Sequence, residues 1–246
     1  MKKCMLMASF LEFKRKRILN IQEEGRQQLF FDRSDAGMRL ASQLSSHQEK
    51  DAVVYAIPSG GIPVAMEVAY ALRSPLDIII VRKIPIPSDP EAGYGAVTED
   101  GSLVLNQPLV KRLRLIASEI EKQADAVRRE IFRRSMLYRK KLLPSPVKGK
   151  PAIIIDDGLA SGYTMLAAIK SLRHRQVSEV TVAVPVASGS AYDLVLPEVD
   201  YLTCLVVSRA SFFAVASFYQ HWHDLKDLEV IDLLESWNRR RALQTK

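Results

Sequence analysis

Five short runs of apolar, mostly β-branched residues constrain the fold more than any other feature of this sequence. They begin at Ala52, Asp77, Ala152, Glu179 and Asp200, and helical patterns separate several of them. Runs that are apolar throughout are typical of strands covered on both faces, and their alternation with helices is typical of a parallel sheet. We therefore predict an α/β fold of three layers, in which helices flank a mostly parallel central sheet.

The composition narrows the class of protein. Apolar residues make up 48% of the 246 residues and charged residues 26%, which is ordinary for a globular protein. No apolar run approaches the ~20 residues that a membrane-spanning helix needs, so we expect no membrane partner. The two cysteines, Cys4 and Cys204, are far apart and suggest neither a disulfide nor a metal site, so we expect a cytoplasmic protein.

Composition and periodicity also suggest boundaries along the chain. We expect an N-terminal extension over residues 1–29, one domain over residues 30–235 and a basic C-terminal tail over residues 236–246. Residues 84–105 are rich in Pro, Gly and acidic side chains, and are predicted to form a long flexible loop because they are too polar for a core. Residues 107–143 have apolar side chains at three- and four-residue steps, which predicts one long amphipathic helix.

The positive charge of the chain is concentrated in two segments. The net charge is +7, but residues 107–150 hold 13 Lys or Arg against 4 Asp or Glu, and residues 1–17 hold six basic residues against one acidic residue. The rest of the chain is therefore net negative. The basic residues of the predicted helix mostly fall off its apolar stripe, so we expect a solvated face, although such a helix could also lie along nucleic-acid phosphates.

The segment AIIIDDGLASGYT, residues 152–164, carries the clearest chemical signal. An apolar strand delivers Asp156 and Asp157 to the carboxyl edge of the sheet, where open α/β folds bind ligands. A loop of small residues and the start of a helix follow, so backbone N–H groups can surround an anion. No lysine stands in this loop, which favours a single phosphate over a triphosphate. The residues expected to hold that phosphate are Gly158, Ala160, Ser161, Gly162, Tyr163 and Thr164.

Carboxylates beside a phosphate cradle can accept hydrogen bonds from vicinal ribose hydroxyls, which indicates a ribose 5-phosphate site. The segment resembles the signature with which type I phosphoribosyltransferases bind PRPP, the 1-pyrophosphate of ribose 5-phosphate. The stretch YAIPSGGIPVA is similar to the family's pyrophosphate loop and implies that Ser59, Gly60 and Gly61 bind there. Arg82 and Lys83 follow the next strand, where the family commonly places a basic residue near pyrophosphate.

The resemblance extends over about residues 30–224 and is closest to a little-characterised prokaryotic group. Residues 84–105 stand where such enzymes carry a flexible hood over the active site. The family displaces pyrophosphate from C1 of PRPP with a nucleobase nitrogen, and this implies transfer of the 5-phosphoribosyl group to a nucleobase-like acceptor. The implied metal is Mg²⁺, held mainly by substrate oxygens with help from Asp156 and Asp157. We also expect a homo-oligomer.

The match departs from part of the family at one position. Members that act on 6-oxopurines carry an acid where this chain has Ala160, so that substrate class is disfavoured. Glu91 is then a candidate general base, and Tyr94 could close over the substrate. The residues expected to take part in catalysis are Asp156, Asp157, Arg82, Lys83 and Glu91.

Three other functions remain compatible with the same sequence. The chain could be a PRPP-sensing regulator or nucleic-acid-binding protein without transferase activity, although no helix-turn-helix pattern is present. It could be a hydrolase or synthase that acts on another sugar phosphate. It could also be a catalytically silent subunit that assembles through the basic helix.

Overall fold

The computed structural model describes residues 28–48, 51–86, 89–142 and 144–244. Its centre is a five-stranded sheet in the order β2-β1-β6-β7-β8, and every neighbouring pair is parallel. The predicted α/β fold with a parallel central sheet is therefore confirmed. The strands are β1 (Val53–Ala56), β2 (Leu76–Ile78), β6 (Pro151–Ile155), β7 (Glu179–Ser188) and β8 (Tyr201–Ser208).

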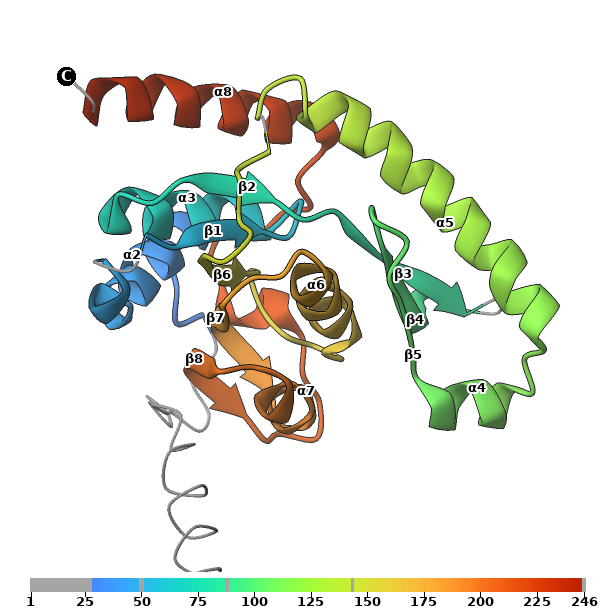
Figure 1. Cartoon of the computed structure of the whole chain (residues 1–246). Coiled ribbons are helices and arrows are strands. Elements are labelled where there is room, and N and C mark those ends of the chain that lie inside the picture. The colour runs from blue at the N-terminus through green and yellow to red at the C-terminus, as the bar shows by residue number, and fades with distance from the viewer. Residues whose placement is uncertain (1–27, 49–50, 87–88, 143, 245–246) are drawn as a thin grey trace, which may run out of the picture.

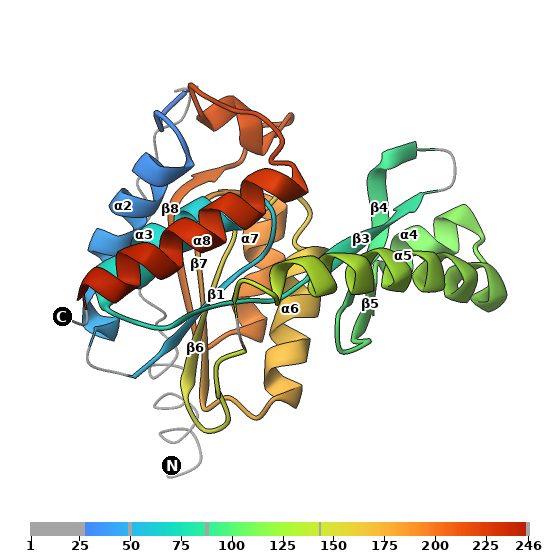
Figure 2. The ribbon, with the colours of Figure 1, turned by 90° about the horizontal axis from the view of Figure 1, so that it is seen from above.

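Helices cover both faces of this sheet (Figure 1 and Figure 2). Side chains on either side of the strands enter two separate apolar clusters: Val54 and Ile153 lie in one, and Tyr55 and Ile154 in the other. Both faces are buried, which explains why the strands are apolar throughout. One face carries α2 (Arg33–Gln43), α3 (Gly61–Leu72) and α8 (Asp227–Gln244), and the other carries α6 (Tyr163–His174) and α7 (Gly189–Val195).

Three short 3₁₀ helices complete this part of the molecule, η1 (Ser45–His47), η2 (Leu196–Glu198) and η3 (Val215–Phe218). Within the described residues, no helix has the length and apolar character that crossing a membrane requires. Cys204 lies in β8 and is buried, and burial raises the pKa of its thiol to about 12. Its environment is that of a small core residue.

The prediction of a long loop over residues 84–105 is wrong. This region belongs to a second, antiparallel sheet in the order β3-β4-β5, with strands β3 (Val81–Ile86), β4 (Asp89–Thr98) and β5 (Leu103–Leu105). The apolar run from Asp77 therefore splits between two sheets. The glycines of this segment suggested a loop. In the structure, a Cβ on Gly95 would lie 2.6 Å from the carbonyl oxygen of Val104, so glycine at this position permits the two strands to pair closely.

The single helix predicted over residues 107–143 is two helices, α4 (Gln107–Leu113) and α5 (Ala117–Tyr138). Asn106 caps the first by accepting a hydrogen bond from the N–H of Leu109 at 3.1 Å. Arg114 ends it in the left-handed conformation, with φ of 54°. Neither Gly nor Pro marks this break, so the apolar periodicity continues through it in the sequence.

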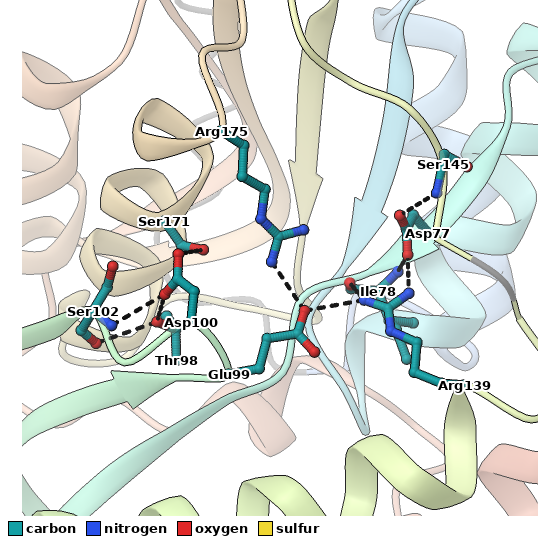
Figure 3. Close-up of polar contacts among 10 residues, drawn as sticks. All are labelled: Asp77, Ile78, Thr98, Glu99, Asp100, Ser102, Arg139, Ser145, Ser171 and Arg175. Atoms are coloured by element: carbon teal, nitrogen blue, oxygen red, sulfur yellow. Dashed lines mark hydrogen bonds and ion pairs between the residues drawn. The ribbon is translucent and has the colours of Figure 1, made fainter.

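The hood, defined here as β3–β5 with α4 and α5, is fixed to the core by a cluster of charges (Figure 3). Glu99, which directly follows β4, accepts hydrogen bonds at 3.0 Å from Arg139, which follows α5, and from Arg175, which follows α6. Arg139 also binds Asp77 of β2. Asp100 accepts a hydrogen bond from Ser171 of α6 at 2.7 Å. These contacts join both sheets and two helices at one place.

The tail predicted over residues 236–246 is also wrong as far as the structure describes it, because α8 continues to Gln244. Trp237 is only 1% exposed, and Arg240 binds Glu67 of α3 through both carboxylate oxygens, at 2.8 and 3.0 Å. Because this segment is rich in basic residues, its buried apolar side chains were not recognised in the sequence. The predicted extension lies outside the described residues up to position 27.

Candidate active site

The two loops that the sequence nominated for ligand binding lie against each other at the carboxyl edge of the sheet. β1 leads into Ser59 and Gly60, and its neighbour β6 leads into Asp156 and Asp157. A Cβ on Gly60 would lie 1.8 Å from Oδ2 of Asp157, and a Cβ on Gly61 would lie 2.7 Å from the carbonyl oxygen of Ile155. Only glycine permits this approach. The peptide bond between Pro58 and Ser59 is cis.

The loop after the two carboxylates is fixed to the neighbouring strand. The N–H of Leu159 donates to the carbonyl of Val186, and the N–H of Ser188 donates to the carbonyl of Leu159, both at 2.8 Å. Gly158 packs tightly, since a Cβ there would lie 2.7 Å from Val215. Leu159 therefore turns inward, and the exposed residues Ala160 and Ser161 turn outward.

The same loop presents a row of free backbone donors. Within the described chain, the N–H groups from Ala160 to Met165 have no hydrogen-bond partner. Gly162 adopts φ of 81° and starts α6, and no side chain caps the helix. Tyr163 and Thr164 form its first turn. Unpaired donors and a helix N-terminus at one point have the chemistry to bind a phosphate-sized anion.

The facing loop offers donors as well. Ser59 and Gly60 have backbone N–H groups without a partner among the described residues. The loop is half-buried and leads directly into α3. Two sets of unpaired donors therefore lie beside the carboxylate pair, one in the loop that follows it and one in the loop that packs against Asp157.

Arg33 is a member of the site that the sequence reasoning missed. Its Nε donates to Oδ2 of Asp157 at 2.9 Å, and only 8% of its side chain and 15% of that of Asp157 is exposed. The guanidinium also lies 3.7 Å from the centre of the Trp222 ring. Tyr219 donates its hydroxyl to the carbonyl of Asp157 at 2.7 Å. Arg33 and Asp157 are 124 positions apart, and no local pattern links them.

Burial and mutual repulsion govern the charge of the acidic pair. Burial raises the pKa of Asp156 well above its usual value, and the charge of Asp157 raises it further. Burial also raises the pKa of Asp157, while the Arg33 guanidinium lowers it. The pair therefore has a deficit of cationic partners, because one guanidinium serves two carboxyl groups.

The predicted cationic residues Arg82 and Lys83 lie on β3. Arg82 is half-buried and Lys83 is exposed, and both line a cavity of about 460 Å³ between β3 and α5. Burial lowers the pKa of Arg82, and the charge of Arg134 lowers it further. Arg134 itself reaches Ser59, with 3.4 Å between Nη1 and Oγ. Arg82 therefore lies near Arg134, and Arg134 in turn contacts the first loop.

Two further residues that the sequence nominated for the site, Tyr94 and Glu91, belong to the hood. Tyr94 is fully buried in the hood and donates its hydroxyl to Gln123 at 3.0 Å, so this structure gives no support to a substrate contact, and that role stays a prediction. The aromatic ring instead fills the apolar space between β4 and α5. Glu91 lies in β4, but its side chain is outside the described part of the structure, and its role stays a prediction.

The donor set suits magnesium only with help from a substrate. Among the described residues, no group of three or more His, Cys, Asp and Glu side chains gathers in one place. Asp157 binds Arg33, and Oδ1 of Asp156 accepts the N–H of Asp157 at 2.9 Å. Mg²⁺ commonly keeps several waters and uses one or two carboxylates with phosphate oxygens. The site fits that mode and excludes a cage made of protein ligands alone.

The fold and the loops described above agree with one protein family. The family model for the phosphoribosyl transferase domain matches residues 32–218, and the chain belongs to this family. The match includes both nominated loops, the whole hood and the start of the domain at α2.

The chain is also similar to individual members. It is 38% identical over 215 residues to two curated Mycobacterium tuberculosis proteins, from strains CDC 1551 and H37Rv, provisionally named phosphoribosyl transferases. The match covers 86% of this chain but 47% of those proteins, so the chain spans about half the length of the curated relatives it matches. The crystal structure of TT1426 from Thermus thermophilus aligns with 34% identity and a TM-score of 0.71, over 85% of this chain and 98% of that chain.

Proposed function

We propose that this chain binds PRPP with Mg²⁺ and transfers the 5-phosphoribosyl group to a nucleobase-like acceptor, with release of pyrophosphate. The observation that carries the proposal is the meeting of three elements at one edge of the sheet. A carboxylate pair leads into one row of unpaired N–H groups, from Ala160 to Met165, and packs against the loop that carries a second, at Ser59 and Gly60. PRPP has matching groups, since a diol lies between a phosphate and a pyrophosphate.

Each part of the site has a role in this proposal. The N–H groups from Ala160 to Met165, with the hydroxyls of Ser161 and Thr164, would bind the 5-phosphate. Asp156 and Asp157 would accept hydrogen bonds from the ribose hydroxyls. The pyrophosphate would lie on the N–H groups of Ser59 and Gly60.

The leaving group determines the difficulty of the reaction. As the bond between C1 and the pyrophosphate oxygen breaks, its electron pair moves to the pyrophosphate, and the acceptor nitrogen forms the new bond to C1. Bound Mg²⁺ would neutralise part of the charge that gathers on the pyrophosphate. Arg82 lies near Arg134, which contacts this loop, and would add a cation. The small residues of both loops let the backbone approach the substrate closely.

The acceptor is constrained mainly by Ala160. Its methyl group can neither take a proton from a 6-oxopurine nor donate to one, and it is exposed beside the phosphate cradle. We therefore propose an acceptor whose nitrogen attacks without a carboxylate at this position. Adenine and pyrimidine bases fit this condition better than hypoxanthine or guanine.

Calorimetric titration of PRPP with Mg²⁺ tests the proposal first. We expect saturable binding by the wild type and at least about tenfold weaker binding by Asp156→Asn. Asp193→Asn is a suitable control, because Asp193 is more than half exposed and pairs only with the exposed Arg209 among the described residues. Release of pyrophosphate in the presence of single nucleobases then identifies the acceptor. Absence of PRPP binding by folded wild type contradicts the proposal.

The nucleic-acid alternative loses support from the charges of α5. Arg128 binds Glu121 and Asp125 at 2.6 Å, and Arg133 binds Glu130 at 2.8 Å. Much of the basic charge on the helix is therefore already paired, so the helix has less charge to offer to nucleic-acid phosphates.

A further inference from the structure

The hood helix α5 reaches the first of the two ligand loops through one side chain. Arg134 lies on α5, 75 positions after Ser59, and its Nη1 stands 3.4 Å from the Ser59 hydroxyl oxygen. Only 18% of the Arg134 side chain is exposed. The contact is at the long end of hydrogen-bond distances and therefore weak. A phosphate oxygen would be a much stronger acceptor for the same N–H group.

Two carboxylates fix the direction of this guanidinium. Glu130 accepts from Nε of Arg134 at 3.1 Å, one turn earlier on α5, and Asp227 at the start of α8 lies 3.5 Å from the same nitrogen. Tyr138 donates its hydroxyl to Asp227 at 2.5 Å and so holds that carboxylate in place. Both acidic groups approach Nε, and the Nη1 end of the guanidinium is left for the loop.

A second cation stands close by. Arg82 is half-buried on β3, and the charge of Arg134 is near enough to lower the pKa of Arg82 after burial has done so. Two like charges repel each other unless an anion stands with them. The carboxylates of Glu130 and Asp227 offset part of this repulsion, and both also bind Arg133.

The unpaired donors show where an anion would lie. The backbone N–H groups of Ser59 and Gly60 have no partner among the described residues, and they belong to the loop that Arg134 contacts. Backbone donors and a guanidinium that converge on one point form an anion site. Arg134 differs in this from its neighbour Arg133, whose hydrogen bonds go to Glu130 and Asp227.

We propose that Arg134 binds the pyrophosphate group of the substrate and stabilises the charge that this group gains as it leaves. The inference rests on the proposed function and deepens it, because it makes the hood helix part of the binding site. In the transfer step the electron pair of the breaking C1–O bond passes to the pyrophosphate, the acceptor nitrogen bonds to C1, and the acceptor proton passes to solvent. Arg134 meets the leaving oxygen atoms of the pyrophosphate and exchanges no proton.

The test compares two arginines of one helix. Mg²⁺-pyrophosphate and ribose 5-phosphate are titrated separately into the wild type, Arg134→Gln and Arg128→Gln. We expect Arg134→Gln to bind pyrophosphate about 10- to 100-fold more weakly, as the loss of one or two charge-assisted hydrogen bonds implies, and to bind ribose 5-phosphate unchanged. Arg128→Gln should match the wild type for both ligands, because among the described residues Arg128 binds Glu121 and Asp125 and shares no partner with Arg134. Arg134→Lys should recover part of the pyrophosphate affinity, since the charge remains.

The outcomes separate this inference from the proposed function. If the wild type binds PRPP and Arg134→Gln binds pyrophosphate as tightly as the wild type, the role of Arg134 is overturned and the proposed function stands. If Arg134→Gln weakens both ligands equally, the residue supports the fold rather than the pyrophosphate, and the inference is again overturned. If the folded wild type binds neither PRPP nor pyrophosphate, the proposed function fails and the role of Arg134 fails with it.

Discussion

At the scale of single residues, the site depends on glycines, which have no side chain, as much as on the residues whose side chains line it. Gly60 and Gly61 let the first loop approach the carboxylates closely, and a Cβ on Gly60 would overlap Asp157 at 1.8 Å. The distance falls far below any ordinary van der Waals contact. Glycine is needed at position 60 for close packing rather than for a left-handed backbone, since the residue has φ of −64°.

Replacement of Gly60 by alanine should therefore displace Asp157. We expect a loss of about 1–3 kcal/mol in the free energy of unfolding, and about tenfold or more in PRPP affinity. Chemical denaturation and calorimetry measure the two effects. Gly101→Ala is the control, because Gly101 has φ of 83° with open space around it, so alanine there strains the backbone without touching the site. Equal PRPP affinity for both variants would show that the loops can separate freely.

Arg33 sets the charge of the acidic pair, and its removal has a pH-dependent signature. The Arg33 charge lowers the pKa of Asp157, which burial otherwise raises. Arg33→Met should therefore raise that pKa further, so that PRPP-Mg²⁺ binding, which needs ionised carboxylates, shifts to higher pH. Stability should fall by about 3–5 kcal/mol at neutral pH, because a buried carboxylate loses its cation. This loss should shrink as the pH falls and Asp157 becomes protonated.

The measurement is the PRPP affinity and the free energy of unfolding across a range of pH. Arg39→Met is the matched control on the same helix, since Arg39 is 54% exposed and forms an i,i+4 pair with Asp35. Such exposed pairs contribute about 0.3–0.5 kcal/mol, and the control should keep the pH profile of the wild type. An unshifted profile in Arg33→Met would contradict the assigned role.

At the scale of elements, the sequence predicted those elements that are specified by residues close together in the chain. The strands of the parallel sheet and the loop after Asp157 are short contiguous segments, so their residues alone specify them. The hood was expected as a flexible loop, and its strands were missed because they are rich in Gly and Pro and are stabilised by packing against α5 and α6. The contacts of Arg33 and Arg134 span 124 and 75 positions, and no pattern in a single sequence marks partners so far apart. The small-residue loop after Asp157 could be recognised in the sequence, whereas the contacts of Arg33 and Arg134 could not.

The charge cluster in Figure 3 makes a prediction about the hood as an element. Glu99 accepts hydrogen bonds from both Arg139 and Arg175, and it is only 16% exposed. Glu99→Gln keeps the shape but removes the charge, so we expect a loss of about 1–3 kcal/mol. Hydrogen exchange should accelerate in β3–β5 more than in the parallel sheet. Glu121→Gln, on the exposed surface of α5, should change stability by less than about 0.5 kcal/mol.

A uniform increase of exchange across both sheets would contradict this account. It would mean that Glu99 stabilises the whole fold and that the hood does not open on its own. An increase confined to β3–β5 would show that the hood can separate from the core at lower cost than global unfolding. Motion of that kind would let a substrate enter beneath α5.

At the scale of the whole molecule, both ends of the described chain pack against other elements of the fold. Phe30 pairs with Tyr219, which brings the start of the domain beside the segment that follows β8. The helix α8 then crosses α3 and also contacts α5 through Asp227 (Figure 2). One C-terminal helix therefore supports both the core and the residue that orients Arg134. Because the C-terminal part of this helix is rich in basic residues, the sequence did not reveal this role.

Truncation after Glu235 should consequently destabilise the entire protein. The deletion removes Trp237, which is 1% exposed, and the pair that Arg240 forms with Glu67, so we expect a loss of at least about 3–5 kcal/mol. Truncation after Ala242 is the control, since it keeps both residues and removes Leu243, which is 76% exposed. Thermal and chemical unfolding of the two truncated chains provide the comparison. Equal stability would mean that the segment from position 236 is the dispensable tail that its composition suggests, and that α8 supports the core only through Val230 and Leu234.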